Sequence, residues 1–210
     1  MSVLHDALGD ISRIRRQMAG STQFRGYGPA TLAGTGVAAI VVASVQARWI
    51  ASPALHLHAY LALWIGTAVV SSSVAAVQVM TRTRRLHPHL SDEMIRGAIE
   101  QFLPAVIAGL LVTSVLLHFA PTLSFLLPGL WQIFYCLGVF ASCRSLPRAM
   151  YAAGAWYLVT GLACLSFADA RAFAPWTMGL AFGAGQLLIA TVLWTDAGQA
   201  GELPGVDDEV

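Results

Sequence analysis

The chain has 210 residues, of which 57% are hydrophobic and 11% are charged, and its formal net charge at pH 7 is +1. A soluble domain carries about 25% charged residues, so this composition is typical of a protein that crosses a membrane several times. The three cysteines have neither metal-ligand spacing nor paired positions in an oxidising loop. The sequence contains no phosphate-binding loop and no basic nucleic-acid motif, so we expect no cofactor and no direct contact with nucleic acid.

The first predicted element is a cytoplasmic amphipathic helix over residues 3–19. Its apolar residues recur every three or four positions, with acidic residues toward its start and basic residues toward its end, as the helix dipole prefers. Residues 20–29 hold three glycines and a proline, which predicts a turn or hinge and completes an N-terminal unit over residues 1–29. The apolar stripe needs a surface to cover it. The alternatives are the bilayer surface, a second copy of the chain in a homodimer, and a cytoplasmic protein partner.

Six apolar stretches of about 20 residues follow, and stretches of this length predict transmembrane helices. The expected fold is therefore all-α, a polytopic bundle of six transmembrane helices over residues 30–196 in the lipid bilayer. Residues 197–210, acidic and rich in glycine and proline, are expected to form a disordered cytoplasmic tail. The predicted spans are Ala30–Ile50, Ala59–Met80, Ile99–Phe119, Leu123–Cys143, Ala149–Ala168 and Pro175–Thr195.

The basic residues predict the orientation of the bundle. All 12 are arginines, and they gather before the first span and in alternate loops after it. Arg48 and Arg171 alone fall in the other set of loops. Short loops rich in arginine stay in the cytoplasm, so both termini are expected there, as in a multi-pass protein of a bacterial inner membrane.

The first group of candidate site residues lies around the loop between the second and third spans. Pro104 cannot donate a backbone hydrogen bond, so the carbonyl of Glu100 loses its intrahelical partner. Together with the Glu100 carboxylate and the Gln101 amide it would form a polar notch at membrane depth, which indicates a functional site. Alternatively, Glu100 pairs with Arg96 or with a basic residue of the loop. The candidate ligand- or partner-binding residues are Arg82, Arg84, Arg85, Glu100, Gln101 and Pro104.

A second group is a sparse layer of polar side chains predicted near the middle of the membrane. Gln132 belongs to it if the fourth helix starts near Thr122, whereas a start at Pro128 places Gln132 close to the outer surface. Such groups line a path for a small solute or hydrogen-bond across helices, each bond contributing on the order of 1 kcal/mol. The members of the layer are Ser71, Ser72, Ser73, Thr160 and Gln186, with Gln132 as the conditional sixth.

Histidines on the outer side form the third group. His56, His58 and His118, together with Asp169 of the last outer loop, would bind a transition metal if they met, because imidazole and carboxylate suit zinc or copper. A closed site needs four well-placed ligands, so the sequence favours interfacial histidines and predicts no metal.

Small residues repeat at four-residue spacing in two spans. Gly179 and Gly183 form one such pair in the sixth span, and Ala30, Gly34 and Ala38 form a series in the first. These faces allow close approach of helix backbones, and packing inside the bundle is favoured over dimerisation.

Four segments together resemble an uncharacterised group of bacterial integral membrane proteins with six spans. They are GSTQFRGYGP at 20–29, EQFLP at 100–104, LPGLWQ at 127–132 and FASCRSLPR at 140–148, and the similarity covers residues 10–195. The resemblance implies no activity and assigns no catalytic residue. It does imply a winged-helix DNA-binding protein as the companion of this chain.

The expected function is non-enzymatic: a sensing, regulatory or partner-binding membrane protein. The soluble segments are too short for a catalytic domain, and the spans lack paired ionisable groups. The alternatives are a small-solute permease or channel subunit, which would use the polar layer, and a metal-binding redox protein. The functional surface is expected in the cytoplasm, around residues 3–19, the arginine cluster and the Glu100–Pro104 notch.

Overall fold

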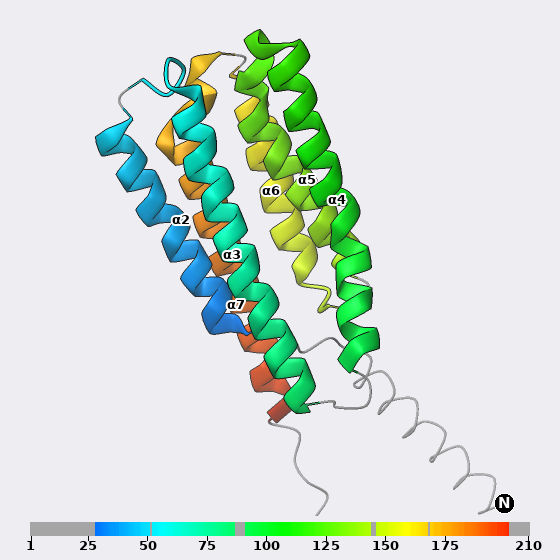
Figure 1. Ribbon diagram of the computed structural model, residues 1–210. Helices are drawn as coiled ribbons and strands as arrows, with labels where there is room; N and C mark the ends of the chain where they lie inside the picture. The colour runs from blue at the N-terminus through cyan, green and yellow to red at the C-terminus, as the bar shows by residue number, and fades with distance from the viewer. Residues whose placement is uncertain (1–27, 51, 87–90, 144–145, 168, 202–210) are drawn as a thin grey trace, which may run out of the picture.

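The computed structural model describes residues 28–50, 52–86, 91–143, 146–167 and 169–201. The predicted amphipathic helix at 3–19 and the hinge up to residue 27 lie outside these described residues. The predicted disordered tail was wrong for residues 197–201, which continue helix α7 to Gly201, and its remainder from residue 202 lies outside the described part. The described part is helical, which confirms the all-α class (Figure 1). Its elements are α2 (Pro29–Trp49), α3 (Leu57–Leu86), α4 (Ser91–Phe119), the 3-10 helix η1 (Pro121–Leu126), α5 (Leu127–Ser142), α6 (Met150–Leu165), the 3-10 helix η2 (Ala170–Phe173) and α7 (Pro175–Gly201).

Five segments are long and apolar enough to cross a membrane: Pro29–Trp49, Leu57–Arg82, Ile99–Phe119, Pro121–Ser142 and Pro175–Gly198. The sixth apolar helix, α6, has 16 residues. At a rise of 1.5 Å per residue it is about 24 Å long, slightly less than the roughly 30 Å hydrocarbon core of a bilayer. The chain is thus a helical protein of the multi-pass membrane type.

Proline decides where the fourth predicted span becomes α-helical. Pro121 opens η1, and Pro128 lies in the first turn of α5. Proline lacks the N–H that an interior helical position needs, so it fits best at a helix start. The α-helix therefore begins at Leu127, as in the alternative that starts near Pro128.

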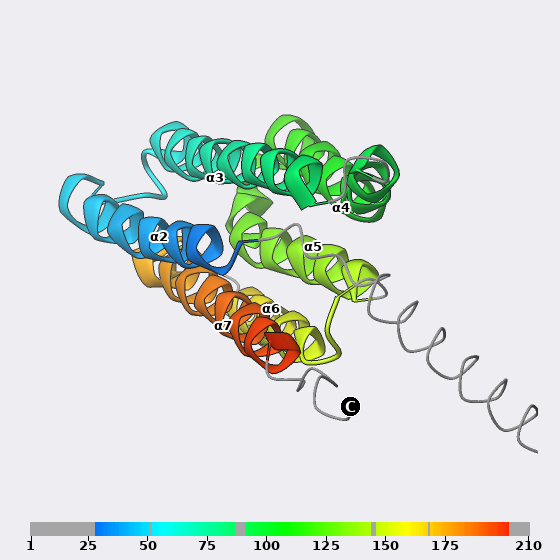
Figure 2. The same ribbon diagram turned by 90° about the horizontal axis from the view of Figure 1, so that it is seen from below.

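The helices form two units of three, seen side by side in Figures 1 and 2. In the first unit α2 lies between α3 and α7; in the second α5 lies between α4 and α6. The two units meet mainly where α6 packs on α7, and η1 contacts η2 at one end of the bundle. We call this the η end, and the end that carries the α3–α4 connection the basic end.

Close packing of α2 on α7 holds the first unit together. A Cβ at Gly36 would come within 2.9 Å of the Gly183 carbonyl oxygen, and a Cβ at Gly179 would collide with Ala43. The pair Gly179 and Gly183 therefore serves an internal contact, as favoured from the sequence. The predicted face of α2 was wrong, because a Cβ at Gly34 would meet nothing within 4 Å. The contact face is instead the buried stripe Leu32, Gly36, Ala39, Ala43 and Gln46.

Candidate functional site

The residues predicted around Glu100 lie on the surface at the basic end. The Arg96 guanidinium donates from Nε to Glu100 Oε1 at 3.2 Å, and these side chains are 81% and 67% exposed. Glu100 therefore pairs with Arg96, which was the alternative to a polar notch. An exposed ion pair of this kind contributes about 0.5 kcal/mol or less to the stability of the fold. Arg82 is exposed near the end of α3. Arg84 and Arg85 belong to α3, but their side chains lie outside the described part.

Pro104 lies inside α4, which remains helical on both sides of it. Pro104 is exposed, and Gln101 is half-buried and already engaged in an interaction. With Glu100 also exposed, these residues form an open strip on the surface of α4 and not an enclosed notch.

The structure does not bring the predicted polar layer together. Ser72 and Ser73 are exposed on α3, which packs against α2 and α4, whereas Thr160 and Gln186 belong to α6 and α7. The Thr160 hydroxyl donates to the carbonyl of Trp156 in its own helix, at 2.9 Å. The six predicted residues therefore do not form one polar site across the bundle.

Gln132 and Gln186 contribute instead to the contact between the two three-helix units. Gln132 Nε2 donates to the Thr177 carbonyl at 3.1 Å, and Gln186 Nε2 donates to the Tyr135 hydroxyl at 2.6 Å. A third bond runs from Trp156 Nε1 to the Ala181 carbonyl at 2.9 Å. We call this contact the seam, formed by Gln132, Tyr135, Trp156, Tyr157 and Gln186 with the part of α7 that they contact.

The seam also holds three of the four buried side-chain oxygen or nitrogen atoms that have no hydrogen-bond partner in the described part of the chain. These three are the Tyr157 hydroxyl and the Oε1 atoms of Gln132 and Gln186, and the fourth is the hydroxyl of Tyr60, whose ring packs against Phe173. A buried polar atom without a partner is unfavourable by about 1–3 kcal/mol. The amide oxygens accept hydrogen bonds, and the hydroxyls donate or accept them. The seam therefore holds buried hydrogen-bonding groups that the described side chains leave unused.

Aromatic rings surround the inner part of the seam. The centroid of the Tyr135 ring lies 4.6 Å from that of Tyr157 and 5.4 Å from that of Phe182. The Tyr157 hydroxyl packs directly against Gly185, and a Cβ atom at position 185 would collide with this hydroxyl. Buried aromatic pairs stabilise this contact beyond their buried area and hold the hydroxyls in place.

Gln46 is a buried polar residue at the η end that sequence reasoning missed. Its Nε2 donates to the Phe173 carbonyl at 2.8 Å, and its Oε1 accepts from Trp64 Nε1 at 2.7 Å. The signal was present, because Gln46 continues the three- and four-residue spacing of the buried stripe on α2. Sequence reasoning also missed three tyrosines, Tyr60, Tyr135 and Tyr157. A tyrosine in a predicted span can face lipid, lie at the membrane boundary or pack in the core, and the sequence does not distinguish these positions.

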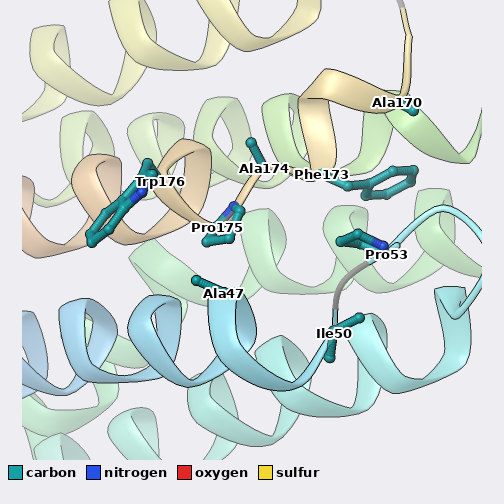
Figure 3. A pocket seen from close by; sticks show the side chains of 8 residues that line it. All are labelled: Ala47, Ile50, Pro53, Ala170, Phe173, Ala174, Pro175 and Trp176. Atoms are coloured by element: carbon teal, nitrogen blue, oxygen red, sulfur yellow. The ribbon is translucent and has the colours of Figure 1, made fainter.

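An apolar cavity of about 400 Å³ opens beside Gln46 at the η end (Figure 3). It lies between the end of α2, the loop that follows, η2 and the start of α7. Its walls include Ala47, Ile50, Pro53, Phe173, Pro175 and Trp176.

The three outer histidines take no part in a cluster of metal-ligand side chains among the described residues. His56 Nδ1 lies 3.2 Å from the Ser52 carbonyl oxygen, His58 is exposed, and His118 stacks edge-on against Phe119. Among the described residues, no three His, Cys, Asp or Glu side chains come together as metal ligands would.

In comparisons by sequence and by structure, no family model, curated protein or solved structure matches the chain. The candidate sites above therefore stand on the geometry of the chain alone.

Proposed function

We propose that the chain is a non-enzymatic regulatory protein of a bacterial inner membrane that binds a cytoplasmic protein. It crosses the membrane six times with both termini in the cytoplasm, and the basic end faces the cytoplasm. The arginine bias predicts this orientation, because basic loops resist translocation. A winged-helix DNA-binding protein is the partner that the resemblance implies.

The observation that carries the proposal is the reach of α3 and α4. Their 30 and 29 residues correspond to about 45 Å each, which exceeds the roughly 30 Å of a hydrocarbon core. The apolar segments end at Arg82 and begin at Ile99, so both helices continue beyond them with more polar residues on the same side of the bundle. Exposed helix ends of this kind offer Arg82, Arg96 and Glu100 to a soluble partner.

Comparative cross-linking tests the proposal. Intact protein is compared with a variant lacking residues 1–19 and with Arg82→Gln/Arg96→Gln. Loss of the same cytoplasmic partner in either variant, with normal membrane insertion, is the expected result. Arg148→Gln is the matched control, because Arg148 is an exposed arginine near the basic end in a different loop. Retention of every partner in both variants would contradict the proposal, as would equal loss in the control.

A small-solute permease is the second candidate, and the seam favours it. Two helical units that meet at buried, unpartnered amide and hydroxyl groups can bind an uncharged solute between them. Proteoliposomes tested for urea and glycerol flux by light scattering should then exceed empty vesicles, and Gln186→Leu should abolish the excess. Flux equal to that of empty vesicles would rule this candidate out for these two solutes.

A further inference from the structure

Each three-helix unit is built on a pair of helices whose backbones touch. A Cβ at Gly129 of α5 would come within 2.9 Å of the Gly161 carbonyl oxygen of α6, and a Cβ at Gly161 would come within 3.0 Å of the Gly129 carbonyl oxygen. Gly36 and Gly183 join α2 to α7 in the same reciprocal way. Contact between backbones cannot be rearranged by a change of side-chain rotamer, so we expect each pair of helices to move as one body.

The contact between the two pairs is different, because side chains make it. Across the seam, the Gln132 amide donates to the Thr177 carbonyl at 3.1 Å, and the Trp156 indole donates to the Ala181 carbonyl at 2.9 Å. A third side chain, the tyrosine at position 157, packs against Gly185. A side chain can turn to another partner without any change in the backbone that carries it.

The three α7 residues that receive these contacts are Thr177, Ala181 and Gly185, which lie four positions apart. Residues at this spacing lie one above another on one face of a helix. A helical carbonyl has two lone pairs and can accept a side-chain donor in addition to its intrahelical bond. The carbonyl groups along this face are therefore equivalent for a donor on α5 or α6. The bonds made by Gln132 and Trp156 do not determine which turn of α7 these residues face.

One bond across the seam does select a register, because it joins two side chains. Gln186 Nε2 donates to the Tyr135 hydroxyl at 2.6 Å. The residues one turn before and after Gln186 are Phe182 and Ala190, and neither side chain has a hydrogen-bonding group. The observed register nevertheless leaves the Oε1 atoms of Gln132 and Gln186 without a partner among the described residues. Because buried polar atoms without partners are unfavourable, a second register can lie close to the observed one in free energy.

We propose that the first unit slides along the second by one helical turn, with the bond between Gln186 and Tyr135 as the latch that holds the observed register. Steps of one turn, about 5.4 Å, between packed helices are an established kind of switching transition. This sliding contact is a property of the fold and does not depend on the proposed function.

The second register places α7 one turn closer to the η end. Gln132 then donates to the Ala181 carbonyl, and Trp156 donates to the Gly185 carbonyl, so both bonds to the α7 backbone are kept. The tyrosine ring that now packs on Gly185 turns aside, because Ile189 takes that place. The latch bond is the one that is lost.

Distances between two spin labels, measured by double electron–electron resonance on the full-length protein in lipid nanodiscs, test the slide. Trp49→Cys on α2 and Tyr151→Cys on α6 label exposed positions at opposite ends of the two units. Their distance distribution should contain a second population that is longer by about 4–5 Å. The controls are Trp49→Cys with Trp194→Cys inside the first unit, and Phe119→Cys with Tyr151→Cys inside the second. Each control should give one narrow distance, and the parent protein, whose three cysteines are buried, should take up no label.

Substitution of the latch should change the ratio of the two populations. Gln186→Leu removes the bond to Tyr135 and should raise the ratio of the longer to the shorter distance about fivefold, as expected for the loss of one hydrogen bond. Gln78→Leu is the matched control, because this half-buried glutamine bonds to Gly28 within the first unit, and the ratio should stay at the wild-type value. A single narrow distance across the seam in both the wild type and Gln186→Leu, equal broadening in the controls within the units, or the same change of ratio in Gln78→Leu would each overturn the proposal. If Gln186→Leu does not fold, Tyr135→Phe, which removes the same bond, takes its place.

Discussion

A tyrosine hydroxyl inside a membrane protein has no bulk water to bond, so its protein partners determine what it contributes. Tyr135 and Tyr157 share one aromatic cluster in the seam but differ in this respect. The Tyr135 hydroxyl accepts a bond from Gln186, whereas the Tyr157 hydroxyl has no partner in the described part of the chain. Their removal should therefore have different consequences for stability.

Replacement of each tyrosine by phenylalanine tests this difference. Tyr135→Phe leaves the Gln186 amide donor buried without its acceptor, so the free energy of unfolding should fall by about 1–3 kcal/mol. Tyr157→Phe removes a buried hydroxyl without a partner, so the free energy of unfolding should not fall and should rise by up to about 1–3 kcal/mol. Denaturant titration of the purified protein in detergent measures both, with each variant serving as the control for the loss of a hydroxyl. Equal losses would mean that Tyr157 also has a partner.

At the scale of elements, small residues decide which helices approach one another. Gly36 and Gly34 lie two positions apart on α2 and therefore on different faces of the helix. Gly36 faces the Gly183 carbonyl of α7, whereas Gly34 faces open space. Helices in a membrane associate through close van der Waals packing, so the face with the glycine contact holds the pair together.

Substitution of these two glycines by leucine tests the α2–α7 contact. Gly36→Leu should reduce the free energy of unfolding by at least about 1–3 kcal/mol, because the added side chain forces the two backbones apart. Gly34→Leu introduces the same residue on an open face and should have little effect. Thermal unfolding in detergent, with the retained monomer measured by size-exclusion chromatography, compares the two. A larger loss in Gly34→Leu would contradict this assignment of the packing face.

At the scale of the whole molecule, α6 determines the number of membrane crossings. It has 16 residues, as α5 does, but α5 continues the apolar segment that begins with η1 at Pro121, whereas α6 stands alone. It nevertheless runs beside α5 and joins the two units through α7 (Figure 1). Because α6 carries no charged residue, a slight tilt change or local thinning of the bilayer accommodates its length at modest cost. We therefore expect α6 to cross the membrane.

Reporter fusions at loop positions test the six-span topology. A reporter active only outside the cytoplasm should be active at Ala54, Pro121 and Ala172 and inactive at Leu86 and Leu146, and a cytoplasmic reporter should give the opposite pattern. Leu146 and Ala172 flank α6, so opposite readings there show that this helix spans the membrane. The same reading at Leu146 and Ala172, or reversal at any two sites, would refute the topology.

The sequence alone determined the helical class and, within a few residues, the five segments that are long and apolar enough to cross a membrane. Long apolar runs, prolines and capping residues act locally, so these features can be read without knowledge of the fold. The sequence also indicated that Gly179 and Gly183 make a close contact, because four-residue spacing of glycines suits one helix face. It left open whether Glu100 pairs with Arg96, although that pair lies within one helical turn.

Tertiary structure decided everything that depends on which helices are neighbours. Only the packing of α3 away from α6 and α7 separates Ser72 and Ser73 from Gln186, and only the meeting of the two units places Tyr135 against Gln186. Likewise, the cavity at the η end exists because the end of α2, the loop after it, η2 and the start of α7 come together there. A one-dimensional pattern shows which face of a helix is small or polar, but the partner of that face depends on long-range packing of the whole bundle.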